Sequence, residues 1–230
     1  MSTVSFARSS KNRLTRHDLD RFAGTTVFDR VARALCQVGC LPRKELYEAW
    51  ETARRVRRLL RGGRVVDLAG GHGLVAPLML ILDDSSPCGV VVDASLPPSA
   101  AAVHGAIVAE WPRLHGRITF VAGHLDGIDI SPADIVVSVH ACGPLTDLVL
   151  NRAARARARV AVLPCCHTTE TCDAGSLGGW LDDALAIDVV RARRLAARNY
   201  RVWTQRIPED ITPKNRLLIG EPRGAWQEGT

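Results

Sequence analysis

The stretch of residues 64–76, RVVDLAGGHGLVA, constrains the fold of this chain more than any other part of it. Its first five residues are a short apolar run with two valines, which is typical of a buried strand. Gly70, Gly71 and Gly73 follow, and a helical pattern begins at Leu74. A strand, a glycine turn and a helix bring backbone N–H groups against a ligand. The stretch therefore predicts a cofactor site in an α/β fold; the alternative is a turn that only joins a strand to a core helix.

Two classes of cofactor use this geometry. The pattern Gly71-x-Gly73-x-x-Ala76, with Asp93 20 residues after Gly73, is compatible with a dinucleotide such as NAD(P). Asp67 at the end of the strand separates the two classes. Its carboxylate would repel a pyrophosphate, whereas it suits the cationic methionine end of S-adenosylmethionine (SAM). The acid therefore favours SAM over NAD(P).

The segment that begins at Asp67, DLAGGHG, resembles motif I of class I SAM-dependent methyltransferases. Ala69 stands where that motif usually has its first glycine. The resemblance implies a Rossmann-like sheet of seven strands that binds SAM through this loop. The cofactor-binding candidates within the loop are Asp67, Ala69, Gly70, Gly71, His72 and Gly73.

The next two predicted strands supply further cofactor candidates. An apolar run ends at Asp93, whose carboxylate can accept two hydrogen bonds from the ribose hydroxyls. The third strand is followed by His124, Leu125 and Asp126. Methyltransferases often place an acid or amide at this point against the adenine, and Leu125 is expected to pack against the adenine face.

The fourth and fifth predicted strands run into His140-Ala141-Cys142-Gly143 (HACG) and Cys165-Cys166-His167 (CCH). With VVDLAGGHG, these motifs resemble a methyltransferase family that includes the eukaryotic tRNA ribose 2′-O-methyltransferases. The resemblance spans residues 64–220 and implies a class I fold and SAM dependence. His140, which also borders the cofactor, and His167 are expected to orient or deprotonate the acceptor, because histidine titrates close to neutral pH.

Two more strands, residues 200–207 and 216–220, complete the sheet as a hairpin. In the methyltransferase topology the sheet has six parallel strands and one antiparallel strand, so the hairpin connection lies at the same edge as the glycine loop. That arrangement places Lys214 and Asn215 near the acceptor. The candidate catalytic residues are His140, Cys142, His167, Lys214 and Asn215.

The cysteines and histidines of HACG and CCH also raise the question of a metal. Adjacent residues of a strand point to opposite faces, which would separate Cys165 from Cys166. The chain also has no Cys-x₂-Cys pair of the kind that holds zinc. We therefore expect no metal, and we expect the cysteines to pack as small apolar groups.

Charge divides the chain into two predicted parts, a basic N-terminal helical cap (1–62) and a SAM-binding methyltransferase domain (63–230). The cap has 14 Lys and Arg against six Asp and Glu, and the domain has 16 against 18. A helix that begins after Pro42 is apolar on one face, with Trp50 and Glu51 as candidates to line the cleft. Its opposite face is expected to carry Arg54, Arg55, Arg57, Arg58 and Arg61. This face is either a surface for phosphates or an ordinary solvated one.

The sequence thus predicts methyl transfer from SAM to an oxygen or nitrogen acceptor, which is RNA or a small metabolite. The alternatives are an NAD(P)-dependent oxidoreductase and a SAM- or RNA-binding protein without turnover. No apolar run reaches membrane length, no hydrophobic leader is present, and the seven cysteines form no regular framework. We therefore expect a cytoplasmic protein with reduced thiols and no membrane contact. Nothing in the sequence indicates an oligomeric state.

Overall fold

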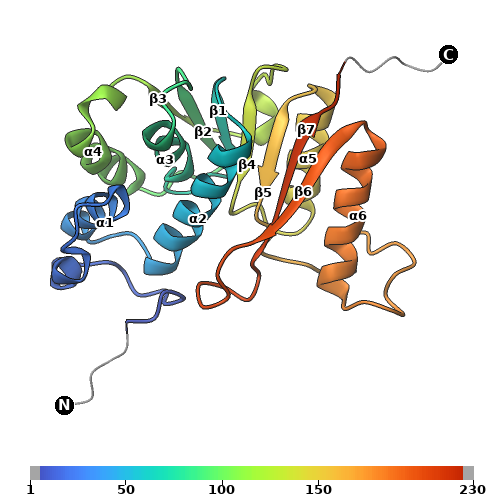
Figure 1. The fold of residues 1–230 in the computed structure, drawn as a ribbon, viewed down its shortest axis with the longest axis horizontal. Coiled ribbons are helices and arrows are strands. Elements are labelled where there is room, and N and C mark those ends of the chain that lie inside the picture. The colour runs from blue at the N-terminus through green and yellow to red at the C-terminus, as the bar shows by residue number, and fades with distance from the viewer. Residues whose placement is uncertain (1–5, 225–230) are drawn as a thin grey trace.

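In the computed structural model, which describes residues 6–224, helices cover both faces of a central β-sheet (Figure 1). The strands are β1 (Val65–Leu68), β2 (Gly89–Asp93), β3 (Ile118–Ala122), β4 (Ile135–Ser138), β5 (Arg159–Val162), β6 (Tyr200–Arg206) and β7 (Arg216–Pro222). The α-helices are α1 (Val27–Val38), α2 (Arg43–Leu59), α3 (Val75–Leu82), α4 (Ala100–Glu110), α5 (Pro144–Arg155) and α6 (Asp183–Ala197). Three 3₁₀ helices are η1 (Arg16–Phe22), η2 (Pro112–Leu114) and η3 (Leu125–Gly127). None of the described helices is long and apolar enough to cross a membrane.

The strand order is β3-β2-β1-β4-β5-β7-β6. β7 lies between β5 and β6 and runs antiparallel to both, so its direction is opposite to that of the other six strands. This arrangement confirms the predicted seven-stranded sheet with six parallel strands and one antiparallel strand. The carboxyl ends of β1, β2, β4 and β5 therefore meet at one edge, where ligands bind in open α/β sheets.

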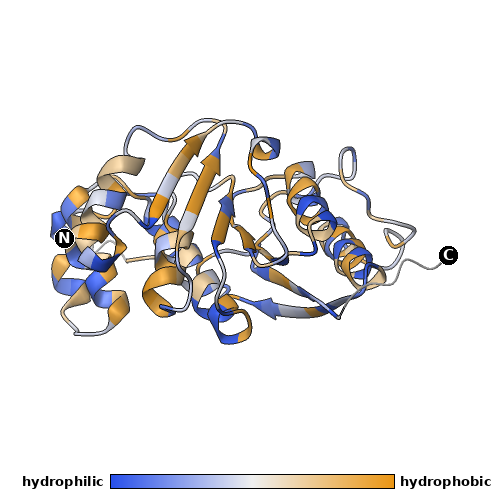
Figure 2. Ribbon diagram, turned by 90° about the horizontal axis from the view of Figure 1, so that it is seen from above, coloured by the Kyte–Doolittle hydropathy of each residue, from blue (hydrophilic) through white to orange (hydrophobic). Residues whose placement is uncertain are grey.

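Alternate residues of the strands contribute their side chains to two separate apolar layers. Val65 and Val91 pack with the helices of the N-terminal half, whereas Val66 and Val92 pack with α5 and the end of α6. Both sets are buried because successive side chains of a strand point to opposite faces. The apolar strands between two layers of helices are visible in Figure 2.

The N-terminal helices share their core with the sheet. Thr26 caps α1 by accepting a hydrogen bond from the N–H of Asp29, and Gly39 ends that helix in a left-handed conformation. Leu35 of α1 and Leu46 of α2 belong to the same buried cluster as Val65 of β1. The cap is thus continuous with the sheet, and the boundary between residues 62 and 63 stays a prediction.

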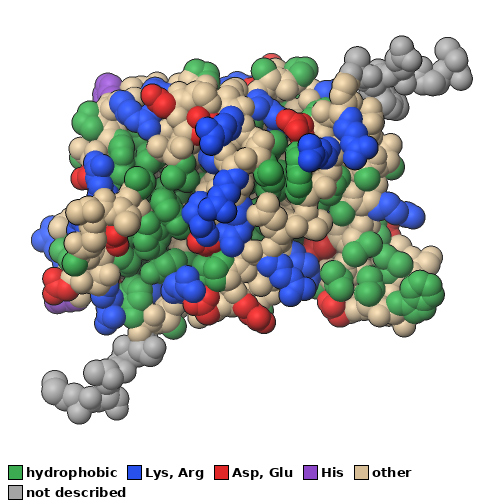
Figure 3. All heavy atoms as spheres, in the orientation of Figure 1, with side chains coloured by type: hydrophobic (Ala, Val, Ile, Leu, Met, Phe, Trp, Pro, Cys, Tyr) green, Lys and Arg blue, Asp and Glu red, His purple; other side chains and the backbone are tan. Residues whose placement is uncertain are grey.

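The prediction for the arginine face of α2 is wrong at one position. Arg57 is buried, because its guanidinium donates to the carbonyls of Met79 and Leu60 and pairs with Asp83. Arg58, by contrast, is exposed. Lys and Arg side chains gather over this part of the molecule in Figure 3.

Candidate functional site

The glycine loop joins β1 to α3 at the carboxyl edge of the sheet. Its backbone is left-handed at Ala69, Gly71 and Gly73, with φ angles of 54°, 57° and 69°. A Cβ on Gly73 would lie 2.5 Å from Cε1 of Phe120, and a Cβ on Gly70 would lie 2.6 Å from a side chain of β2. Gly70 and Gly73 are therefore required for the loop to pack against the sheet.

Gly71 differs from the two neighbouring glycines because a Cβ at this position would clash with no atom of the chain. A Cβ at this position would meet only the His140 ring, with Cδ2 at 3.7 Å. Packing therefore does not require glycine here. The half-buried backbone here is a cradle that a side chain would fill, which fits a ligand that lies across the loop.

Asp93 is linked directly to this cradle. One carboxylate oxygen accepts a hydrogen bond from the N–H of Gly71 at 2.9 Å, and the other accepts one from the N–H of Ser95 at 2.9 Å. Each oxygen keeps a second lone pair. Asp93 can therefore still accept hydrogen bonds from two neighbouring hydroxyls, as expected for a ribose contact.

Asp67 lies beneath the loop, whereas the sequence predicted a carboxylate open to the cleft. No part of its side chain is exposed. Its Oδ2 accepts a hydrogen bond from the N–H of Ala76 at 3.4 Å, and its Oδ1 has no hydrogen-bond partner. Burial raises the pKa of Asp67 to about 7, with the carboxylates of Asp93 and Glu45 adding to the rise and the Ala76 hydrogen bond opposing it.

These features fit SAM. The cradle at Gly71 leaves room for a ligand, Asp93 offers acceptors for a diol, and Asp67 supports the loop from beneath by accepting a hydrogen bond from the N–H of Ala76. Asp67 would thus act through the loop instead of by direct contact.

His72 fixes the loop between two helices. Its Nδ1 lies 2.9 Å from Oε1 of Glu45 on α2, and its Nε2 lies 2.9 Å from Oγ of Ser99, just before α4. Both ring nitrogens therefore already have hydrogen-bond partners, so His72 would contact a cofactor through its backbone. Sequence reasoning missed Glu45 and Ser99, because nothing in the local pattern distinguishes them from other polar helix residues.

The two α2 residues singled out from the sequence have other surroundings. The Trp50 ring packs against Phe28, with ring centroids 5.1 Å apart. Glu51 forms ion pairs with Arg54 and Arg55 of its own helix. Neither contact places these side chains at the glycine loop, where Glu45 stands instead.

The three candidates after β3 divide between surface and core. His124 and Asp126 are exposed, and Asp126 lies 3.4 Å from Arg152. Leu125 is buried in the second apolar layer. Asp93 at the end of β2 pairs with Ala122 at the end of β3, so this segment begins beside Asp93. The contacts of its residues with adenine stay a prediction.

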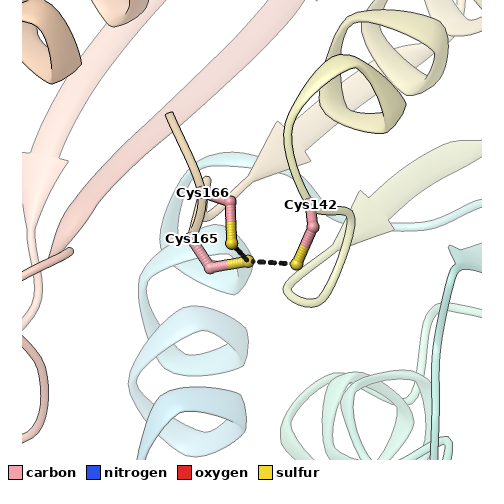
Figure 4. A group of neighbouring side chains, drawn as sticks. All are labelled: Cys142, Cys165 and Cys166. Carbon is pink, nitrogen blue, oxygen red and sulfur yellow. Dashed lines mark hydrogen bonds between the residues drawn. The ribbon is translucent and has the colours of Figure 1, made fainter. Parts of the chain in front are cut away.

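The HACG and CCH segments bring three thiols together (Figure 4). The sulfur atoms of Cys142, Cys165 and Cys166 all lie within 4.8 Å of one another. The prediction that Cys165 and Cys166 point apart is wrong, because β5 already ends at Val162 and the alternation of a strand no longer applies. The imidazole of His140, one third exposed, lies on the same edge, 3.9 Å from Glu45.

A buried polar network holds these two segments in place. The Arg191 side chain is only 1% exposed; it donates to the carbonyl of Gly143 and pairs with Asp147 and Asp188. Asp188 accepts a hydrogen bond from Nε2 of His167 at 2.8 Å. Burial alone would raise the pKa of Asp188, but the hydrogen bonds from His167 and Arg216 outweigh it and lower the pKa below its ordinary value.

The remaining acceptor candidates have different surroundings. The His167 side chain is 97% buried against α6, since only 3% is exposed, so it positions the CCH segment. The Asn215 side chain donates to the carbonyl of Ile207 and closes the β6–β7 connection. Lys214 in the same connection is exposed, and its charge acts on Cys142 and Cys166. The structure therefore brings His140, Cys142 and Lys214 to the open edge, while His167 and Asn215 support them.

A cavity of about 360 Å³ lies between α6 and strands β6 and β7. Leu185, Val189 and Leu217 provide apolar walls, and Asp188 and Arg216 provide polar ones. None of the glycine-loop residues lines it, so the cavity is separate from the proposed cofactor site.

Two solved structures share this fold at low sequence identity. An O-methyltransferase family protein from Burkholderia thailandensis is 20% identical with a TM-score of 0.53, over 89% of this chain and 62% of that protein. The mitomycin 7-O-methyltransferase MmcR is 17% identical with a TM-score of 0.51, over 89% of this chain and 60% of that enzyme. The chain thus spans about three fifths of the length of either protein. No curated protein sequence matches it significantly.

A protein-family model described as "Methyltransferase domain" matches residues 44–171. The match begins near the start of α2, runs through the glycine loop and HACG, and ends just after CCH. It covers more than half of the chain, so the chain belongs to the methyltransferase domain family, whose methyl donor is S-adenosylmethionine.

Proposed function

We propose that this chain transfers the methyl group of SAM to an oxygen or nitrogen atom of an acceptor bound at the carboxyl edge of the sheet. The observation that carries the proposal is the open face of Gly71 with the His140 ring at 3.7 Å. An acceptor-orienting imidazole then borders the backbone cradle that fits the cofactor. Family membership supports SAM over the nicotinamide alternative.

Some residues of the site bind the cofactor, and others orient the acceptor. Asp93 accepts hydrogen bonds from the ribose, and the loop held by Glu45 and His72 presents its backbone to the cofactor. SAM supplies an electrophilic methyl group when bound. His140 orients the acceptor and takes its proton where the acceptor is a hydroxyl. Much of the acceleration comes from alignment of the reacting groups, which needs no further catalytic group.

RNA is the acceptor class that we propose first. The HACG and CCH segments resemble the family that includes tRNA ribose 2′-O-methyltransferases, which supports it. Basic residues at exposed positions supply the charge that phosphates require: Lys11, Arg13, Arg16, Arg58 and Arg61.

A small metabolite is the second candidate, and a separate observation favours it. Several cap arginines are already neutralised within the chain: Arg43 by Asp18, Arg55 by Glu51 and Arg57 by Asp83. Paired arginines contribute less to a phosphate-binding surface, which lowers the charge available for RNA.

A substitution at Gly71 tests the cofactor site. Gly71→Ala adds a methyl group to the cradle, so we expect SAM binding to weaken by roughly 1–3 kcal/mol, about 5- to 150-fold in Kd. Gly116→Ala is the matched control, because Gly116 has a similar φ of 71°, has no neighbour within 4 Å and precedes β3 at the opposite edge. Calorimetry with SAM should show the loss only for Gly71→Ala. Equal affinity in the two variants would contradict the proposed site.

Salt dependence tests the acceptor class. If the acceptor is RNA, the logarithm of the binding constant should fall linearly with the logarithm of salt concentration, because phosphate contacts release counterions. RNA binding measured at several salt concentrations, followed by a mass shift of one CH₂ in the RNA after incubation with SAM, would support this acceptor. Absence of RNA binding, together with methylation in a metabolite pool, would establish the second candidate. SAM binding without its consumption in either pool would contradict turnover.

A further inference from the structure

We propose that Cys142, Cys165 and Cys166 form a binding site for a thiophilic metal ion, with zinc as the ion that the geometry fits. The three sulfur atoms lie within 4.8 Å of one another and come from two different segments, after β4 and after β5 (Figure 4). Thiolate sulfur is a preferred ligand of Zn²⁺. The argument for this site does not rest on the proposed function.

The sulfur separations are close to those of a zinc–thiolate site. Two thiolates at about 2.3 Å from a tetrahedral zinc lie about 3.8 Å apart. The sulfur atoms of Cys165 and Cys166 are 3.7 Å apart. Those of Cys142 and Cys165 are 2.9 Å apart, so these two would separate by roughly 0.9 Å on binding the ion.

A disulfide explains the cluster less well. A bond between Cys142 and Cys165 would need a sulfur separation of about 2.05 Å, shorter than the 2.9 Å observed. It would also leave Cys166 without a role, although this third thiol lies within the same 4.8 Å. Convergence of three thiols is a property of a metal site and is not needed for a disulfide.

Hydrogen bonds and ion pairs support the backbone around the thiols, as outer-shell contacts support metal ligands. Arg191 donates to the carbonyl of Gly143, next to Cys142, and pairs with Asp188. Asp188 in turn accepts from His167, next to Cys166. One buried arginine–aspartate pair therefore fixes both segments that carry the thiols.

The coordination would be incomplete with these three residues. Three protein ligands with a fourth position left for water or substrate is the arrangement of catalytic zinc sites. Cys142 is exposed, so the fourth position opens toward the carboxyl edge where His140 and Lys214 lie. A ligand with a soft or basic donor atom would bind there.

Cobalt titration of the full chain tests the site. The protein is reduced, freed of metal by dialysis against a chelator, and titrated with Co²⁺ without oxygen. We expect one equivalent to bind with sulfur-to-cobalt charge-transfer absorption, which Zn²⁺ then abolishes by displacing cobalt. Elemental analysis of chain purified without a histidine tag shows which ion it carries; copper in place of zinc would keep the site and change its ion.

Serine variants show which thiols bind. Cys142→Ser and Cys166→Ser should each weaken cobalt binding by at least about 100-fold, because even outer-shell changes cost about 10–100-fold. Cys88→Ser is the matched control, since Cys88 precedes β2 at the opposite edge, and it should bind like the parent chain. Circular dichroism of each metal-free variant separates a lost ligand from a lost fold.

Three results would overturn the proposal. One is a folded parent chain whose cobalt spectrum lacks charge-transfer absorption. Another is an equal loss of affinity in Cys88→Ser. The third is a Cys142–Cys165 disulfide identified by mass spectrometry in a chain that takes up no metal after reduction. Each result leaves SAM binding unaffected, so it is distinguishable from failure of the proposed function.

Discussion

Asp67 is the residue at which sequence and surroundings conflict most. In the sequence, its place at the end of β1 is the basis for favouring SAM over a dinucleotide, yet the carboxyl group is fully buried and one of its oxygens has no partner. Burial raises its pKa to about 7. An acid held in this way is unfavourable when ionised, so the loop carries a cost in stability that depends on pH.

The pH dependence of stability follows from that shift. Between pH 4 and 7 the unfolded chain releases the Asp67 proton while the folded chain keeps it, so the stabilisation from this group is complete below pH 4 and is lost as pH rises toward 7. Relative to Asp67→Asn, the free energy of unfolding should fall by up to about 1.4 kcal/mol per pH unit in that range. Urea unfolding of both proteins from pH 4 to 8 measures it. Parallel curves would contradict the raised pKa.

Ala69 is a second residue in the loop whose surroundings were not expected from its type, because its backbone is left-handed. Its φ of 54° is one that L residues with a Cβ adopt at a cost, and it occupies the position where motif I usually has glycine. The departure from the motif does not change the path of the loop, because the left-handed turn is formed in spite of the methyl group.

Elements outside the loop determine where its functional groups stand. Glu45 on α2 and Ser99 before α4 hold the His72 ring from both sides. Arg191 and Asp188 on α6 hold the two segments after β4 and β5. The helices that flank the sheet thus act as supports for the carboxyl edge as well as sources of core residues.

Removal of the Glu45 carboxylate should loosen the loop. Glu45→Ala leaves Nδ1 of a largely buried His72 without its partner, which costs about 1–3 kcal/mol, and we expect weaker SAM binding in the same variant. Glu45→Gln keeps an acceptor and should recover most of both. Thermal unfolding and calorimetry with SAM give the two quantities.

Glu110→Ala is the control for that experiment. Its carboxylate pairs with Arg30, and both side chains are about 40% exposed, so the loss should be about 0–1 kcal/mol. SAM affinity should be unchanged, because α4 carries Glu110 at its far end. If Glu45→Ala lost no more stability or affinity than Glu110→Ala, the supporting role of α2 would be refuted.

Across the whole molecule, the N-terminal helices and the sheet form one apolar layer. Leu35, Leu46 and Val65 belong to a single buried cluster, so the basic segment predicted as a cap also builds the core. Part of its positive charge is neutralised by ion pairs within the fold, as the Arg57–Asp83 and Arg43–Asp18 pairs show. A net charge counted along the sequence therefore overstates what this region offers to a partner.

The sequence by itself determined the sheet and the loop, because their signals are local. The valines of β1, the glycines that follow and the acid at Asp93 lie in order along the chain, and the resemblance of the loop to motif I of class I methyltransferases implied the strand topology that the structure has. Only the tertiary structure decided the burial of Asp67 and Arg57, the support of His72 by Glu45, and the convergence of three thiols. Each of these depends on contacts between segments far apart in the chain, where neither periodicity nor spacing carries information.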